Sequence, residues 1–166
     1  VLSLMNDVAR YYRTLMIEFK AKIDVEEKEW GIRNAKLRHS RKFWYFSAML
    51  TFVMLEKQGG ERDELVKKII EAFTIPTYLR IPMLLDGLNF RLERLLDSYF
   101  WFIDYMGLAE NRQRLKQVSF EDRHQTQQLD YRAIRANARD LHNEMMNLLR
   151  DLPGPSYRKL LDWFLL

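Results

Sequence analysis

Apolar residues near the start of the chain recur at intervals of three and four. The recurring positions are Met5, Val8, Tyr12, Leu15, Met16, Phe19 and Ile23. This spacing places one apolar stripe along a helix, so the sequence predicts a helix from Leu4 to Ile23. A second stripe, which lies roughly opposite and is not strongly polar, consists of Arg10, Thr14, Ile17 and Ala21. We therefore expect this helix to be covered on two sides, and a missing domain is one candidate cover.

The second predicted helix has a basic beginning and an apolar end. Trp30 and Gly31 interrupt the pattern, and the helix then runs from Ile32 to Lys57, before a Gly-Gly pair at 59 and 60. Its first half carries the basic residues Arg33, Lys36, Arg38, His39, Arg41 and Lys42. Its second half is apolar nearly all round, which predicts a stem buried in the core.

Turn-forming residues divide the next part of the chain into shorter elements. Glu61 to Phe73 reads as an amphipathic helix with acidic residues in its first turn. The two prolines between Thr74 and Pro82 predict a kinked connection. A long helix is expected from Leu84 to Gly107, and a short one from Leu108 to Lys116.

The last part of the chain carries clear capping signals. Ser119 and Asp122 predict a capping box at the start of a final long helix, which a Pro-Gly-Pro sequence ends at 153–155. Ser156 is expected to cap a terminal turn, Tyr157 to Phe164, that docks on the core. Since no strand-like alternation occurs, we predict an all-α fold: residues 1–166 form a single domain, a bundle of about six helices.

Composition narrows the setting of the protein. Cysteine is absent from the 166 residues, which favours a reducing compartment such as the cytoplasm. The longest uncharged apolar run, Phe43 to Leu55, is too short to cross a hydrocarbon layer of roughly 30 Å, so no membrane contact is predicted. The chain begins with Val1 and enters an amphipathic pattern at once, and we expect it to be the C-terminal part of a longer protein.

Several catalytic centres are excluded by the sequence. It contains no glycine-rich phosphate loop and no Gly-Ser followed by paired aspartates. Glu93, Asp97 and Asp104 have helical spacing but lie among arginines and apolar residues, so we read them as a solvated face with no metal. The scattered histidines suggest no triad. We assign no catalytic residue and no metal ligand to this chain, and it needs no cofactor of its own.

The strongest local feature is a cluster of basic residues beside aromatic ones. Arg10 and Arg13 flank two tyrosines, and the second helix adds further cations. Basic side chains beside aromatic rings can bind phosphates and stack bases. The predicted nucleotide-binding or anion-binding residues are Arg10, Arg13, Arg33, Lys36 and Arg41. The alternative is a solvated helix end whose cations pair with the carboxylates of Glu18, Glu26, Glu27 and Glu29.

Two pairs of residues have a spacing that loosely resembles that of helical RNases called HEPN domains. These enzymes carry a short arginine and histidine signature, and here Arg33 precedes His39 and Arg135 precedes His142. The chain holds many arginines, so such pairs also arise by chance.

Two longer stretches carry a more distinctive resemblance. They are Asn6 to Arg13, which reads NDVARYYR, and Trp30 to Leu50, which reads WGIRNAKLRHSRKFWYFSAML. Together they resemble the helical C-terminal region of bacterial nucleotidyltransferase-like proteins. The resemblance implies a magnesium-dependent parent protein whose missing N-terminal domain holds the catalytic Gly-Ser and aspartates. This chain would then be a non-catalytic companion that helps to form the cleft for nucleotide or acceptor.

Three classes of function therefore remain open. The chain is a non-catalytic domain of a nucleotidyltransferase, a stand-alone helical module that binds nucleic acid or protein, or a HEPN-like RNase. A net charge of +4 and a pI near 9.3 suit an anionic partner in each case. The second stripe of the first helix also suggests self-association into a homo-oligomer.

Overall fold

The computed structural model describes residues 1–24, 29–124 and 129–152, and these ranges contain helices and no strand. The helices are α1 (Leu2–Asp24), α2 (Trp30–Lys36), α3 (Lys42–Gln58), α4 (Arg62–Thr74), α5 (Thr77–Leu84), α6 (Glu93–Gly107), α7 (Ala109–Lys116) and α8 (Leu129–Asp151). A π-helical turn, Leu37–Arg41, joins α2 and α3 into one rod, and a 3-10 helix, Glu121–His124, precedes α8. Counting the rod once gives seven helices in the described ranges, which confirms the predicted all-α bundle.

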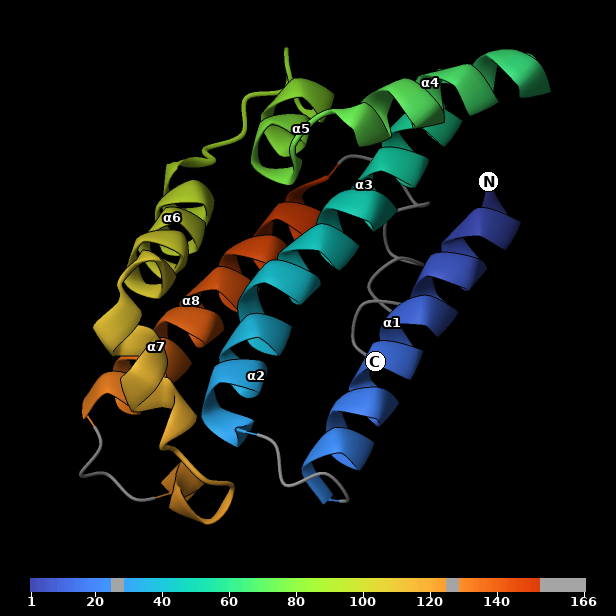
Figure 1. The fold of residues 1–166 in the computed structure, drawn as a ribbon. Coiled ribbons are helices and arrows are strands. Elements are labelled where there is room, and N and C mark those ends of the chain that lie inside the picture. The colour runs from blue at the N-terminus through green and yellow to red at the C-terminus, as the bar shows by residue number, and fades with distance from the viewer. Residues whose placement is uncertain (25–28, 125–128, 153–166) are drawn as a thin grey trace.

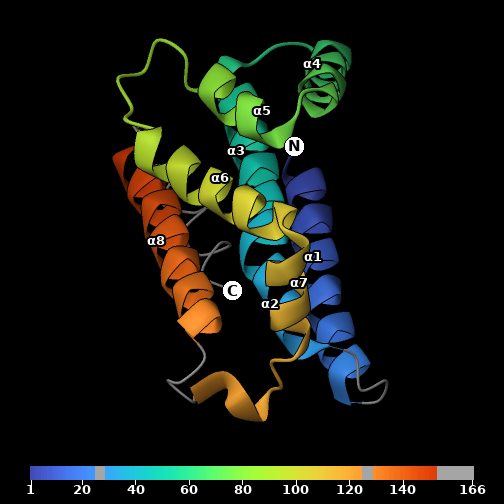
Figure 2. The same cartoon turned by 60° about the vertical axis from the view of Figure 1, so that its left-hand side comes forward.

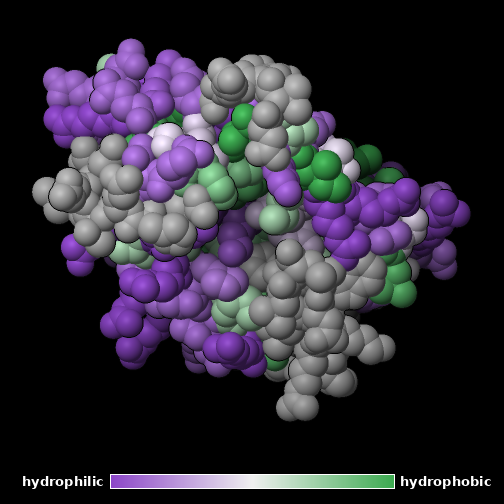
Figure 3. Space-filling model, turned by 90° about the horizontal axis from the view of Figure 1, so that it is seen from below, coloured by the Kyte–Doolittle hydropathy of each residue, from purple (hydrophilic) through white to green (hydrophobic). Residues whose placement is uncertain are grey.

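The rod of α2 and α3 lies at the centre of the bundle (Figure 1). α1 packs along one side of α3, while α4 and α5 contact its far end. α6 lies beside α8 in both ribbon views (Figures 1 and 2). Viewed from below, hydrophilic side chains cover most of the coloured surface, and hydrophobic ones gather in small separate patches (Figure 3).

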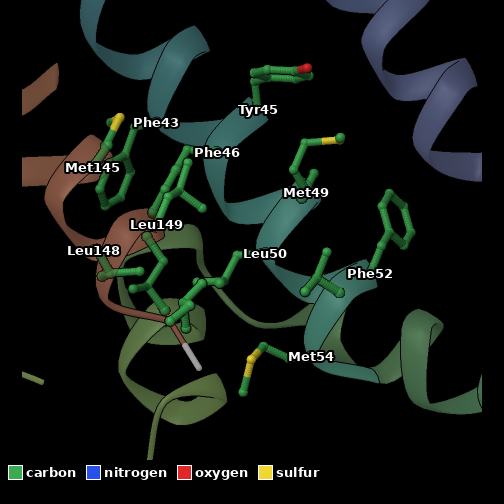
Figure 4. Close-up of a cluster of buried hydrophobic side chains, with 14 of the residues drawn as sticks. Phe43, Tyr45, Phe46, Met49, Leu50, Phe52, Met54, Met145, Leu148 and Leu149 are labelled. Carbon is green, nitrogen blue, oxygen red and sulfur yellow. The ribbon is translucent and has the colours of Figure 1, made fainter. Parts of the chain in front are cut away.

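The larger core forms around α3, as its apolar sequence predicts. Phe43, Phe46 and Leu50 are fully buried and belong to one cluster with Met145 and Leu149 of α8. Figure 4 shows Phe43 beside Met145, and the two leucines 148 and 149 of α8 near the same face of α3. Burial of this kind is the main favourable term in folding. No helix in the described ranges combines the length and apolar character needed to cross a bilayer.

A smaller core joins α2 to α6, α7 and α8. Its close packing explains why residue 31 is a glycine. Its buried residues are Trp30, Ile32, Ala35, Phe102, Leu115, Val118, Tyr131 and Ile134. The predicted interruption at Trp30 and Gly31 is wrong, because the helix begins at Trp30 and includes Gly31. A Cβ atom on Gly31 would lie 2.3 Å from the carbonyl oxygen of Leu115 and 2.7 Å from Cβ of Val118. Glycine is required here for close packing against α7.

The region around α5 differs from the sequence prediction. The expected kinked connection from Thr74 to Pro82 contains a helix, α5, with Pro82 inside it. An internal proline removes one main-chain hydrogen bond from a helix. The fully buried side chain of Ile81 anchors α5 to the core despite this loss. The helix expected from Leu84 begins only at Glu93, because Gly87 adopts a φ of 75° in the turn between α5 and α6.

The predicted capping box forms, but it does not cap the last long helix as the sequence predicts. The main-chain N–H of Ser119 donates to Oδ2 of Asp122 at 3.1 Å, and the N–H of Asp122 donates to Oγ of Ser119 at 3.3 Å. This reciprocal box opens the 3-10 helix, whereas α8 begins at Leu129. The terminal turn predicted from Tyr157 to Phe164 and its cap Ser156 lie outside the described residues.

The outer helices α1 and α4 are the least covered. α1 buries Met5 and Ala9 but leaves its second stripe in solvent, and Ile17 retains 70% of its accessible surface. In α4, an amphipathic helix as predicted, no residue is buried. α1 contributes Met5 and Ala9 to the larger core, and α4 packs against the edge of that core through Ile69 and Phe73.

Candidate anion-binding site

A groove of about 590 Å³ lies between α1, the α2–α3 rod and α8. α1 supplies an apolar wall with Tyr12, Met16 and Phe19. The other two helices supply the cationic side chains Arg38, Lys42, Arg135 and Arg139 and the titratable imidazole of His142. Asn34, Leu37 and Ala138 complete the described lining, which contains no carboxylate. The groove therefore combines an aromatic wall with a cationic one.

Helical periodicity places the cationic residues on common faces. On α8, positions 135, 138, 139 and 142 follow the spacing of three and four that aligns side chains along one side of a helix. On the rod, Arg38 belongs to the π turn and Lys42 begins α3 one turn later. Side chains from the rod and from α8, about a hundred residues apart in sequence, thus line the same groove.

The π turn is held by a buried histidine. His39 is fully buried, and its Nδ1 lies 2.8 Å from the carbonyl oxygen of Ala35. Its Nε2 lies 3.0 Å from Oδ1 of Asn137 on α8. Such turns are rare in helices and frequently occur at functional sites. Here the turn leaves Arg38 exposed beside the groove, while His39 faces inward.

The cations of the groove act on one another. Burial, together with the nearby charge of Arg38, lowers the pKa of Lys42 to about 8. Burial also lowers the pKa of His142, with added repulsion from Lys42 and Arg150. Both shifts disfavour the charged form, and a bound anion would oppose them.

The five residues chosen from the sequence do not line this groove. Arg10 is exposed and pairs with Asp7 at 3.6 Å, and Lys36 is also exposed. The half-buried Arg33 has an Nε atom without a hydrogen-bond partner in the structure. Arg13 acts electrostatically on Tyr45, and Arg41 acts on Tyr12.

The tyrosine pair joins α1 to α3 just above the groove. The rings of Tyr12 and Tyr45 stack with centroids 4.4 Å apart. Burial and the neighbouring Tyr45 raise the pKa of Tyr12 to about 12, although the charge of Arg41 acts in the opposite direction. Burial also raises the pKa of Tyr45, against the charge of Arg13. Arg13 and Arg41 therefore reach the α1–α3 interface, and Tyr12 links that interface to the groove.

The alternative prediction is that nearby carboxylates neutralise the basic helix end. In the structure, two of these carboxylates pair with other lysines. Glu18 pairs with Lys22 at 3.4 Å, and Glu29 pairs with Lys116 of α7 at 3.4 Å. Glu26 and Glu27 lie outside the described residues. Within the described ranges, neither Arg38 nor Arg139 forms an ion pair.

Sequence reasoning missed most of the groove. The basic run of the second predicted helix contains Arg38 and Lys42, but the five predicted site residues include neither of them, nor Arg139. Arg135 and His142 appear only in the predicted RNase-like pair. The spacing of Arg135, Arg139 and His142 along α8 was the available signal, because it aligns three cationic or titratable groups on one helix face.

The groove is a poor site for magnesium. That ion prefers carboxylate and other oxygen ligands, whereas the described lining is cationic. Among the described residues, no three histidine, aspartate or glutamate side chains are placed to hold a metal.

Comparison with protein-family models, with curated proteins and with solved structures finds no match to the chain. The resemblance to nucleotidyltransferase-like proteins stays a prediction. The chemical class of the ligand is therefore inferred from the side chains that line the groove.

Proposed function

We propose that this chain is a non-catalytic helical domain that binds the phosphates of a nucleotide or of a nucleotide-bearing acceptor in the groove between α1, α3 and α8. The observation that carries the proposal is the set of five cationic or titratable side chains on two walls, with no carboxylate in the described lining. Guanidinium groups bind phosphate oxygens through paired hydrogen bonds, and Lys42 adds a compact positive charge.

The aromatic wall supports a nucleotide over a simple polyanion. Tyr12 and Phe19 face the groove from α1, opposite the cations of α8. A base stacked on an aromatic side chain gains about 1–3 kcal/mol, whereas inorganic phosphate gains nothing from such a wall. We therefore expect nucleotides to bind more tightly than pyrophosphate or triphosphate alone.

Calorimetry can test the proposal with matched variants. ATP, CTP, GTP, UTP and triphosphate would each be titrated, with and without magnesium, into the wild-type protein. The groove variant is Arg38→Ala with Arg139→Ala; both side chains are exposed, so folding should survive. The control is Arg10→Ala with Arg13→Ala, which removes the same charge from outside the groove.

The expected result is saturable binding that the groove variant weakens by more than about tenfold, since a charge-assisted hydrogen bond contributes about 1.5–3 kcal/mol. The control variant should bind nearly as the wild type does. If only the control variant lost binding, the site would instead be the basic cluster predicted from the sequence, which contains Arg10 and Arg13. Absence of binding to every ligand would overturn the proposal.

The assignment to a nucleotidyltransferase rests on the resemblance of the first third of the chain. It predicts that the natural protein carries an upstream domain with a Gly-Ser and two aspartates, and that this domain supplies the magnesium site. Sequencing the complete transcript or locus tests this directly. An upstream region without that motif would leave a stand-alone binding module.

A second candidate function is a HEPN-like RNase, because Arg135 and His142 line the same groove. The other candidate pair loses support, since His39 is fully buried and engaged with Ala35 and Asn137. This reading predicts RNA cleavage that Arg135→Ala and His142→Ala abolish. Cleavage that persists unchanged in both variants would exclude it.

A further inference from the structure

An exposed edge of α1, beside the face that packs on α3, carries a regular basic and apolar stripe. Arg13, Ile17 and Lys20 follow one another at spacings of four and three, and all three are exposed. Ile17 keeps 70% of its accessible surface, the largest exposed fraction among the large hydrophobic residues of α1. In the part of the chain described, neither Arg13 nor Lys20 forms an ion pair. The stripe is thus available to a partner with acidic and apolar groups.

The outward face of α6 carries the complementary pattern. Asp97 and Asp104 are exposed, and between them lie Phe100 and Trp101, which keep 40% and 38% of their accessible surface. The buried residues of α6, Leu95 and Phe102, point the other way. Neither aspartate forms an ion pair among the residues that the structure describes.

The two stripes match in length as well as in charge. Arg13 and Lys20 are seven residues apart on α1, and Asp97 and Asp104 are seven residues apart on α6. At 1.5 Å per residue, each pair spans about 10.5 Å along its helix. Two helices in contact can therefore form both ion pairs at once, with the apolar side chain of Ile17 between the aromatic rings.

One molecule cannot bring these faces together. α1 and α6 lie on opposite sides of the bundle, with α3 and α8 between them (Figure 1). A second copy can, and we infer that two copies of this chain associate head to tail, with the α1 stripe of one molecule on the α6 stripe of the next. A pair of α1 stripes would instead place like charges together, which disfavours a symmetric contact through α1.

The contact has definite physical properties. It joins two different surfaces, so repetition gives a ring or an open chain. One helix on another buries less area than a standard interface of about 1,600 Å², so the association is weak and reversible. Exposed ion pairs are screened by salt, and the association should weaken as ionic strength rises.

Sedimentation equilibrium with charge-reversed variants tests the inference. One variant is Arg13→Glu with Lys20→Glu, and the other is Asp97→Lys with Asp104→Lys. A control, Arg62→Glu with Lys67→Glu on α4, makes the same charge change as the first variant at two exposed positions outside both stripes. Circular dichroism would establish that each variant is folded.

The wild type and the control should show concentration-dependent association, which each stripe variant weakens by more than about tenfold. An equimolar mixture of the two stripe variants should regain it, because each offers the other a complementary face. A wild type that stays monomeric up to about 1 mM would overturn the inference. Failure of the mixture to associate would also overturn it. Loss of association in the control variant would overturn it as well.

Discussion

His39 of the π turn stacks on Phe102 of α6, with ring centroids 4.0 Å apart and planes 5° apart. The same imidazole reaches Asn137 of α8, so one side chain connects three helical elements. His142, by contrast, is only partly buried. The groove cations Arg38, Arg135 and Arg139 lie on the elements that His39 joins, and their relative placement depends on it.

Replacing His39 with alanine should destabilise the fold strongly. The change opens a space beside Phe102 and leaves Asn137 and the Ala35 carbonyl without their partner. We expect a loss of about 2–4 kcal/mol in the free energy of unfolding. Urea denaturation would measure it. His142→Ala, at a partly exposed position in the groove, should cost less than about 1 kcal/mol and serves as the control.

Acid should destabilise the protein through the same residue. Burial lowers the pKa of His39, although its hydrogen bonds to Ala35 and Asn137 act in the opposite direction. The unfolded chain then binds more protons than the native one, so stability falls as pH drops below about 6.5. The lowered pKa of His142 adds to this effect. Denaturation curves between pH 8 and 5 would show it, and a stability that rises in acid would contradict the expectation.

Ligand binding should be linked to proton uptake near pH 8. Lys42 has a pKa of about 8, and a phosphate in the groove would raise it by favouring the charged form. Binding therefore takes up protons, and affinity should fall as pH rises through 8. Calorimetry in buffers with different ionisation enthalpies counts those protons. Lys42→Arg, which keeps the charge, should remove the pH dependence around 8.

Salt should distinguish a nucleic acid from a mononucleotide as the ligand. A nucleic acid held by several phosphates releases counterions, so its affinity falls steeply with salt. Each arginine removed from the groove should lower the slope of log K against log salt by about 1. Fluorescence anisotropy with a short single-stranded RNA measures this slope. A shallow slope that is equal in the wild type and in Arg38→Ala would argue against nucleic acid in the groove.

Gly31→Ala should destabilise the smaller core. Its new methyl group would meet the Leu115 carbonyl oxygen, a main-chain atom that cannot move aside cheaply. Overpacking of this kind costs about 1–3 kcal/mol. Gly107, at the end of α6, has nothing within 4 Å of an added Cβ, so Gly107→Ala should be neutral or stabilising. Thermal unfolding of the two variants compares them, and equal melting temperatures would contradict this account.

The sequence predicted the helices whose patterns are local. α1 carries a stripe at helical spacing, and the second half of the rod is apolar nearly all round, so both could be recognised without knowing their neighbours. α5 was missed because Pro76 and Pro82 resemble a break, whereas the burial of Ile81 holds the helix together. The predicted start of α6, at Leu84, is too early. The segment before Glu93 also directs apolar side chains to the core, so its pattern resembles that of the helix.

The groove was harder to predict than the fold. Arg38 and Arg139 meet only because α2, the π turn and α8 pack together, and no spacing within one segment encodes that meeting. The sequence drew attention to Arg10 and Arg13 because they adjoin tyrosines. In the folded chain the ring of Tyr12 lies in the groove lining, while Arg10 turns outward to Asp7.

One wall of the groove belongs to α1, a helix that packs mainly on α3. Its amide hydrogens are therefore expected to exchange through a local opening that leaves the remaining helices folded. A ligand that bridges Phe19 and Arg139 would tie α1 to α8 and slow that exchange. α4, which buries no side chain and lies outside the groove lining, should exchange at the same rate with or without ligand.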